Sequence, residues 1–212
     1  LQKIEQDGVT VYPNYYIEEE TKDVDSTIRI FKPRTAVDKV CLMQGKMPEK
    51  TDEIAIDRMY ADNNELKVGD DLKVGKQSLK ITGLVALSDY SALFSNTSDM
   101  MFDATKFGVA IMTEDGFATL DDTHIHYSYA WKYNDPPKND TEAKTMGEDF
   151  LKKLAKRGTI VNYIPEFVNQ AIIFTGDDMG GDSAMFTAFL YIVVAIIAFV
   201  FAITTSNTIS KE

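Results

Sequence analysis

A run of uncharged residues near the C-terminus constrains this chain more than any other feature. Residues 184–203 read AMFTAFLYIVVAIIAFVFAI, and the uncharged run continues through Ser210 before Lys211 and Glu212. As a helix rising about 1.5 Å per residue, these 20 residues reach roughly 30 Å, the thickness of a bilayer's hydrocarbon core. The Leu, Ile, Phe and Val residues alone favour insertion by roughly 4 to 7 kcal/mol. The run therefore predicts a transmembrane helix rather than the buried helix of a large soluble core.

The part of the chain before this run is acidic. The formal net charge is −11, and the two charged residues after the run cancel. An acidic surface repels phosphate groups, which argues against nucleic acid as a partner and against docking on anionic lipid headgroups. The sequence has no Gly-x-x-x-x-Gly-Lys-Ser/Thr loop and no assembled catalytic motif. We therefore expect a protein that is not an enzyme and that needs no cofactor or metal.

The single cysteine and the first residue give two further expectations. Cys41 is the only cysteine, so an intrachain disulfide is excluded. Its apolar neighbours Val40, Leu42 and Met43 predict a buried, inert thiol. The chain begins at Leu1 without a methionine or a signal peptide. We expect it to be part of a longer protein with an export signal or a first membrane helix upstream.

The pattern before the apolar run predicts a mixed, strand-rich α+β domain of two lobes. The expected strands are residues 9–17, 27–31, 53–57, 72–74, 78–85, 106–112, 124–133 and 159–164, with 172–175 as a further candidate. The expected helices are the tail of one at 1–6, then 59–66, a short one capped by Thr113, and 142–156. The predicted organisation is a domain at 1–178, a juxtamembrane joint at 179–183 and a membrane helix at 184–210.

Two segments invite a metal-site interpretation. His124 and His126 would lie on the same face of a strand, with only Asp121 and Asp122 as loose third ligands. We favour two ordinary strand histidines. The segment 177–182, DDMGGD, lacks the ligand spacing of an EF-hand and has no bidentate Glu. It is better interpreted as the joint before the membrane helix, with Asp182 or Ser183 as its cap.

The small residues of the membrane helix gather on one face. At 100° per residue an arc of about 80° holds Ala184, Ala188, Tyr191, Ala195, Ala198 and Ala202, and Ser206 continues it. Phe and β-branched residues occupy the opposite face. Small residues allow helix backbones to approach closely, whereas bulky apolar residues suit lipid. The sequence therefore predicts packing against other membrane helices, from the same chain or a partner.

A series of short motifs then gives a resemblance to a known family. In order, they are residues 45–48 (GKMP), 53–57 (EIAID), 66–70 (LKVGD) and 79–85 (LKITGLV). The chain resembles the FtsX-like permeases of ABC transporters, with a MacB-like extracytoplasmic core domain before a membrane helix. Residues 88–94, 100–112 and 174–179 are similar to clostridial-type members. The resemblance covers essentially the whole chain.

The resemblance implies a permease subunit in the cell membrane, with its soluble domain on the extracytoplasmic side. It implies a separate cytoplasmic ATPase as partner, a permease dimer or pseudo-dimer, surrounding lipid, and an extracellular protein or peptide as a compatible ligand. The joint and the membrane helix would act as a lever that carries the ATPase cycle to the outer domain. Peptides, lipids, lipoproteins and cell-wall hydrolase partners are all compatible with such a domain.

Two other functions remain open at this point. One is a single-pass receptor or sensor, which leaves the alanine face unexplained unless the protein dimerises. The other is a membrane-anchored hydrolase that uses His124 and His126, for which bound zinc would be required.

Overall fold

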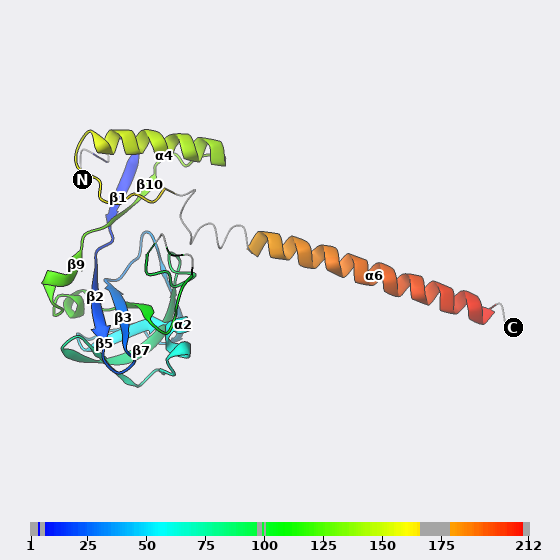
Figure 1. The fold of residues 1–212 in the computed structure, drawn as a ribbon, viewed down its shortest axis with the longest axis horizontal. Coiled ribbons are helices and arrows are strands. Elements are labelled where there is room, and N and C mark those ends of the chain that lie inside the picture. The colour runs from blue at the N-terminus through cyan, green and yellow to red at the C-terminus, as the bar shows by residue number, and fades with distance from the viewer. Residues whose placement is uncertain (1–3, 5–6, 97–98, 100, 166–178, 210–212) are drawn as a thin grey trace. The chain divides into compact units, whose positions relative to one another are not determined.

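The computed structural model describes residues 4, 7–96, 99, 101–165 and 179–209 of the chain (Figure 1). It divides into two units, Leu1–Ala171 and Ile172–Glu212. The first unit contains two separate sheets with helices, and the second contains one long apolar helix. The predicted fold class, a strand-rich α+β domain followed by one apolar helix, is confirmed.

The larger sheet closes on itself. Its strands are β2 (Tyr16–Thr21), β3 (Ser26–Phe31), β4 (Val40–Gly45), β5 (Glu53–Asp57), β6 (Asp71–Val74), β7 (Gln77–Leu87), β8 (Phe107–Ile111) and β9 (Ile125–His126). The hydrogen-bonded order runs β3-β8-β5-β7-β6-β2, and β2 pairs with β3 again. Strand β4 pairs with β7 beyond the end of β6, and β9 pairs with β2. We call residues 16–126 the large lobe.

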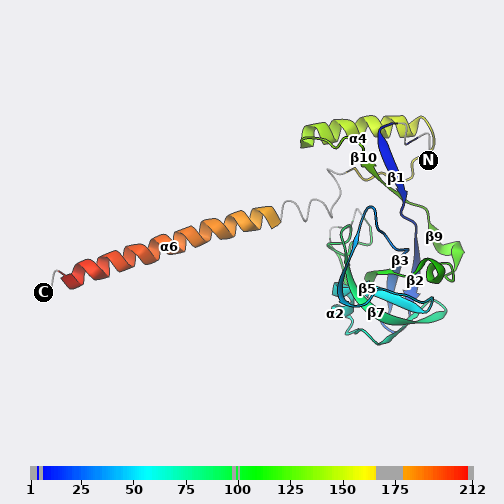
Figure 2. The ribbon, with the colours of Figure 1, turned by 180° about the vertical axis from the view of Figure 1, so that it is seen from behind.

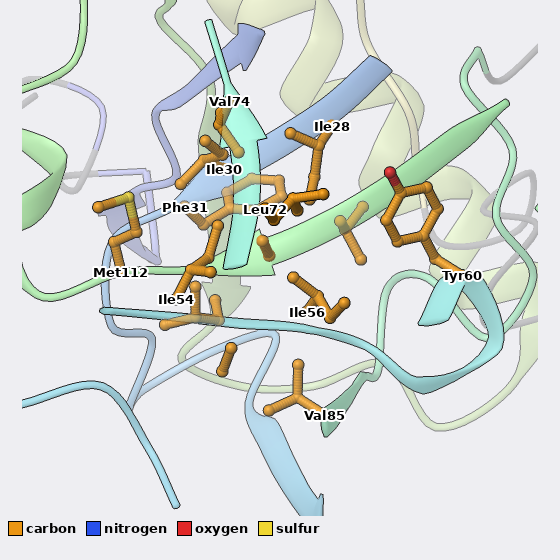
Figure 3. Packing of buried hydrophobic residues seen from close by; sticks show 14 of the residues in the cluster. Ile28, Ile30, Phe31, Ile54, Ile56, Tyr60, Leu72, Val74, Val85 and Met112 are labelled. Carbon is orange, nitrogen blue, oxygen red and sulfur yellow. The ribbon is translucent and has the colours of Figure 1, made fainter. Parts of the chain in front are cut away.

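The interior of this closed sheet is the main hydrophobic core. Every residue of β5 and β8 is buried, including Glu53 and Asp57 at the two ends of β5. Figure 3 shows Ile28, Ile54 and Ile56 converging in this core, with Tyr60 of helix α2 (Arg58–Asn63) at one side. The Tyr60 hydroxyl lies 2.6 Å from Ser26 Oγ, so the buried polar atom is satisfied.

A smaller lobe is built from two strands and one helix. Strand β1 (Val9–Pro13) pairs antiparallel with β10 (Tyr129–Tyr133), and α4 (Asp140–Ala155) lies across them (Figures 1 and 2). The ring of Trp131 lies 5.4 Å from that of the buried Phe150 on α4. On the other side it stacks on Tyr163 at 5.3 Å, and the Tyr163 hydroxyl donates to Gly147 O. We call β1, β10, α4 and Tyr163 the small lobe.

The large lobe is an insertion in the small lobe. The chain leaves β1 through Asn14 and Tyr15 and returns to β10 through Tyr127 and Ser128. These two crossings run side by side, because Asn14 N donates to Ser128 O at 2.9 Å and the Tyr15 and Tyr129 hydroxyls lie 2.9 Å apart. We call this pair of crossings the ribbon.

Several strand predictions differ from the structure. Residues 9–17 and 124–133 were each expected to be one strand, but both break at the ribbon, where the chain passes from one sheet to the other. Strand β2 extends through Glu18–Glu20, which had been assigned to an acidic connection. Residues 159–164 form no strand, since Val161 is fully solvent-exposed and Tyr163 packs as a side chain instead. Candidate strand 172–175 lies outside the described residues, as does most of 1–6.

Other predicted elements are confirmed with small shifts of boundary. Strands β5 and β8, the hairpin of β6 and β7, and helices α2 and α4 occur where they were expected. Thr113 caps the short helix α3 (Glu114–Phe117), because its hydroxyl accepts from Gly116 N at 2.9 Å. The single turn η1 (Asp122–His124) precedes β9.

Candidate functional site

A pocket of about 580 Å³ opens in the large lobe, next to the ribbon. Tyr16 and His126, the first paired residues after the ribbon, form part of its wall. The exposed side chains of Met101 and Phe102 line the opposite part. Arg29 of β3 lies in the pocket as its most buried charged group, with a side chain that is 12% exposed.

Arg29 is held by a complete set of partners. Its Nε and Nη2 both donate to Glu18 Oε1, at 2.9 and 2.5 Å. Its Nη1 donates to the Tyr90 hydroxyl at 2.6 Å, and Nη2 also donates to Ser95 O at 2.9 Å. Buried arginine is tolerated only when it is paired and hydrogen-bonded in this way. The group therefore ties β2, β3 and the segments that carry Tyr90 and Ser95 together.

Aromatic rings continue this arrangement as a stack. The Arg29 guanidinium lies 4.3 Å from the ring centroid of Tyr16 and 5.0 Å from that of Phe107. His126 stacks on Tyr16 with ring centroids 4.8 Å apart and planes 9° from parallel. Arginine and aromatic faces attract each other through the ring quadrupole. The pocket thus combines aromatic rings with polar and charged side chains, which include the Arg29–Glu18 ion pair, Asp103 and Lys106.

Burial and hydrogen bonding together set the pKa values of Arg29 and Tyr90. Burial alone would lower the pKa of Arg29, but its contacts with Tyr90 and Glu18 outweigh that effect, and the pKa is raised. Burial raises the pKa of Tyr90 to about 12, although Arg29 opposes the shift. Tyr90 therefore stays protonated well above the range in which an exposed tyrosine ionises.

Replacing Tyr90 by phenylalanine is expected to flatten the alkaline loss of stability. An unfolded tyrosine ionises near pH 10, whereas the pKa of folded Tyr90 is about 12. The stabilisation from protonated Tyr90 is therefore complete below about pH 10 and is lost as the pH rises to about 12. Urea unfolding at a series of alkaline pH values measures the slope. Tyr127→Phe, which removes an exposed tyrosine, is the control; equal slopes in both variants would contradict the assignment.

The two histidines lie in different elements and have different partners. His124 lies in η1 rather than in a strand, and its Nδ1 is 3.3 Å from Glu19 Oε1. His126 lies in β9 and stacks on Tyr16. Asp121 accepts from Thr123 N and Oγ1 as the cap of η1. Among the described residues no group of three or more His, Cys, Asp or Glu side chains is placed to hold a metal ion. The shared-face geometry was wrong because the chain turns just before β9.

Cys41 is exposed, so the prediction of a buried thiol was wrong. It lies on β4, and β7 is the only described strand that pairs with β4. The neighbouring Leu42 and Met43 are also exposed, at 42% and 52%. The apolar sequence of β4 indicated burial, but the strand lies at an edge with little covering it.

The motifs behind the family resemblance have structural roles in the large lobe. Glu53 Oε2 accepts from Glu49 N at 2.8 Å and Lys50 N at 3.2 Å, and these bonds lower its pKa. Asp57, at the other end of β5, caps α2 through Met59 N and Tyr60 N. Asp70 Oδ2 accepts from Lys67 N, which closes the turn before β6. These residues specify the fold rather than a binding site.

Helix α6 (Met179–Ile209) carries the predicted membrane segment. Its stretch Met185–Thr205, 21 residues, is long and apolar enough to cross a membrane. The helix includes residues 179–183, which the sequence had assigned to a joint. Ala188, Tyr191, Ala195 and Ala198 of the predicted packing face are exposed in this unit. The side chains of Ala184, Ala202 and Ser206, like the segment 177–178, lie outside the described residues. The packing face stays a prediction.

Comparison with known proteins gives structural similarity only. No protein-family model matches the chain, and no curated protein matches it. The extracellular domain of the noncanonic ABC-type transporter YknZ from Gram-positive bacteria is similar, with a TM-score of 0.41 and 13% identity over 74% of this chain and 82% of that one.

Two further solved structures are similar in the same range. The periplasmic region of MacB from Actinobacillus actinomycetemcomitans has a TM-score of 0.37 and 12% identity, over 71% of this chain and 77% of that one. A domain of a putative permease protein from Porphyromonas gingivalis has a TM-score of 0.34 and 14% identity, over 81% and 87%. The first of the three structures is described as a transporter domain and the third as a permease domain.

Proposed function

We propose that this chain is the extracytoplasmic domain and following membrane helix of an ABC transporter permease subunit. A separate cytoplasmic ATPase would supply the energy, as the resemblance to FtsX-like permeases implies. The chain would lie in the cell membrane, with the two lobes on the extracytoplasmic side. The order of motifs that the sequence shares with FtsX-like permeases supports this function.

The observation that carries the proposal is the insertion of one lobe in the other. The small lobe holds β1, the first described strand, and α4, the last described helix before the apolar α6. An ion pair between Asp7 and Arg157 joins the segment before β1 to the segment after α4. Along the chain α6 follows the small lobe, so a force applied through α6 would reach the small lobe before the large lobe. This order of connection suits a domain that transmits movement.

The same arrangement assigns roles to the two lobes. The small lobe would follow the membrane helix, and the large lobe, with its aromatic pocket, would meet an extracellular protein or peptide. The alanine face of α6 would pack against other helices of the permease, which works as a dimer or pseudo-dimer in this proposal. Export of a substrate and purely mechanical transmission are both compatible with these roles.

Purification of the full-length protein from membranes tests this function. We expect a stoichiometric subunit with an ATP-binding cassette to remain bound and to be identified by mass spectrometry. A matched preparation in which Ala195 and Ala198 are both replaced by leucine should lose other membrane helices from the complex, since the larger side chains block close approach. Recovery of a lone single-pass chain after mild cross-linking would overturn the proposal and favour a receptor.

A further inference from the structure

The ribbon is not the only connection between the two lobes. Residues 32–39, which link β3 to β4, also touch both lobes and the ribbon. We call these residues the strut. The strut belongs to the large lobe by sequence, but its contacts reach Asn14 in the ribbon and Lys132 in β10. It therefore bridges the one place where the chain passes between the sheets.

The strut is fixed firmly to the large lobe. Arg34 forms a two-pronged ion pair with Asp89, with Nη1–Oδ2 at 2.7 Å and Nη2–Oδ1 at 2.9 Å. The two side chains are only 6% and 18% exposed. The guanidinium also lies 4.2 Å from the ring centroid of Phe31. Paired arginines of this geometry and burial are the strong class of ion pair.

The contacts at the other end are weaker. Asn14 Nδ2 donates to Asp38 Oδ2 at 3.4 Å, and Asn14 Oδ1 accepts from Arg34 Nη1 at 3.3 Å. Lys132 Nζ donates to Ala36 O at 3.1 Å in an exposed position. Bonds at the long limit of hydrogen-bond distance, or open to water, contribute little individually. The contacts with Asn14 and Lys132 can break while the ion pair between Arg34 and Asp89 stays intact.

Local strain and charge point the same way. Asp38 has a φ of +47°, a left-handed conformation that a residue other than glycine adopts at a cost. Its carboxylate also faces like charge: burial raises the pKa of Asp38, and Asp89 raises it further, against the opposing effect of Arg34 and Lys132. The backbone conformation of Asp38 and its repulsion by Asp89 thus both destabilise the end of the strut that contacts the ribbon.

We infer that the strut is a releasable brace that sets the resting arrangement of the two lobes, and that it opens at the contacts of Asn14 and Lys132. Two short crossings alone are a typical hinge, since few residues need to change conformation. The strut restricts that hinge to one arrangement of the lobes until its contacts with Asn14 and Lys132 break. The inference concerns the domain itself and holds whether or not an ATPase binds the chain.

The single native cysteine makes the test direct. In the full-length protein, spin labels on exposed Cys41 in the large lobe and on Lys144→Cys in α4 report the distance between the lobes. The double variant Asn14→Ala/Lys132→Met removes the weak contacts and leaves Arg34 and Asp89 intact. We expect a distance distribution about twofold broader than that of the parent protein. Lys153→Met, which changes an exposed lysine of α4 away from the strut, should leave the distribution unchanged.

A second label pair separates release from unfolding. Cys41 paired with Lys67→Cys lies entirely within the large lobe and should give the same distribution with and without the double change. Broadening of this internal pair would overturn the inference, because it would mean that the lobe itself had loosened. Superimposable lobe-to-lobe distributions for the double variant and the Lys153→Met control would overturn it as well.

Discussion

Replacing Gly83 by alanine is expected to lower the free energy of unfolding of the large lobe by about 3 kcal/mol. Gly83 in β7 pairs with Gly45 in β4. A Cβ at Gly83 would lie 2.4 Å from Lys46 O and 3.1 Å from Leu42 Cδ1. The nearest atom is backbone, so no side chain can rotate away. Strand β4 must separate from β7 or the closed sheet must distort.

Gly158→Ala is the matched control for this change. A Cβ at Gly158 meets nothing within 4 Å, so the same chemical substitution should leave stability nearly unaltered. Far-UV circular dichroism of the full chain in detergent measures the unfolding midpoint, and hydrogen exchange of β4 and β7 locates the loss. Equal midpoints for Gly83→Ala and Gly158→Ala, with unchanged exchange in β4, would show that β4 and β7 do not pack as closely as described.

The close approach also explains part of the family resemblance. Gly45 opens the GKMP motif and Gly83 lies in the LKITGLV motif, two segments far apart in the sequence. A Cβ at Gly45 would lie 2.3 Å from Thr82 O, and its φ of +75° is a conformation that suits glycine. The two motifs therefore supply the two sides of one closely packed strand pair. This shared requirement could not be recognised from either motif alone.

What could be predicted from the sequence were the features with local signals. Strand β8 is a continuous apolar run and β5 has an apolar centre, the β6–β7 hairpin has Gly75 at its turn, and α4 has helical periodicity. Each signal lies within a few residues and does not depend on the rest of the fold. The apolar run of α6 is the strongest example.

The features that were missed depend on the arrangement of the sheets. Glu18 could be in a strand because Arg29 on β3 neutralises it across the pair. Cys41 looked buried because an apolar strand at an edge has the same sequence as one in a core. The breaks at the ribbon arise because one chain serves two sheets. All three features depend on which strands pair with one another, and patterns within a few residues of sequence do not show that pairing.

Arg29 is the site residue that sequence reasoning passed over. A weak signal existed, since a single arginine lies between Ile28 and Ile30 in strand β3. Such a residue faces away from the core in a period-2 pattern, and on an exposed face it would be unremarkable. Only the fold reveals that Glu18, Tyr90 and the ring of Tyr16 enclose it.

Two arginines in the middle of α6 are expected to prevent membrane insertion. The double variant Ile192→Arg/Ile196→Arg should cost about 6 to 8 kcal/mol on the insertion scale, against roughly 4 to 7 kcal/mol that favours the native segment. At the middle of both ranges the sign of the insertion free energy reverses, whereas a single arginine costs about half as much and leaves insertion favourable. Extraction by alkaline carbonate of residues 1–212 expressed alone, so that no other membrane helix retains the chain, measures the effect, with the variant moving from the membrane fraction to the soluble or degraded fraction.

The arginine variant is expected to behave differently if α6 functions in water. Its described side chains between Met185 and Thr205 are almost all exposed, so arginines there would raise solubility and would disturb no packing within the unit. Ile192→Leu/Ile196→Leu keeps the apolar surface and should behave as the native chain in either case. Retention of the arginine variant in the membrane to the same extent as the leucine variant would contradict a spanning helix, and with it the lever through which the small lobe is proposed to move.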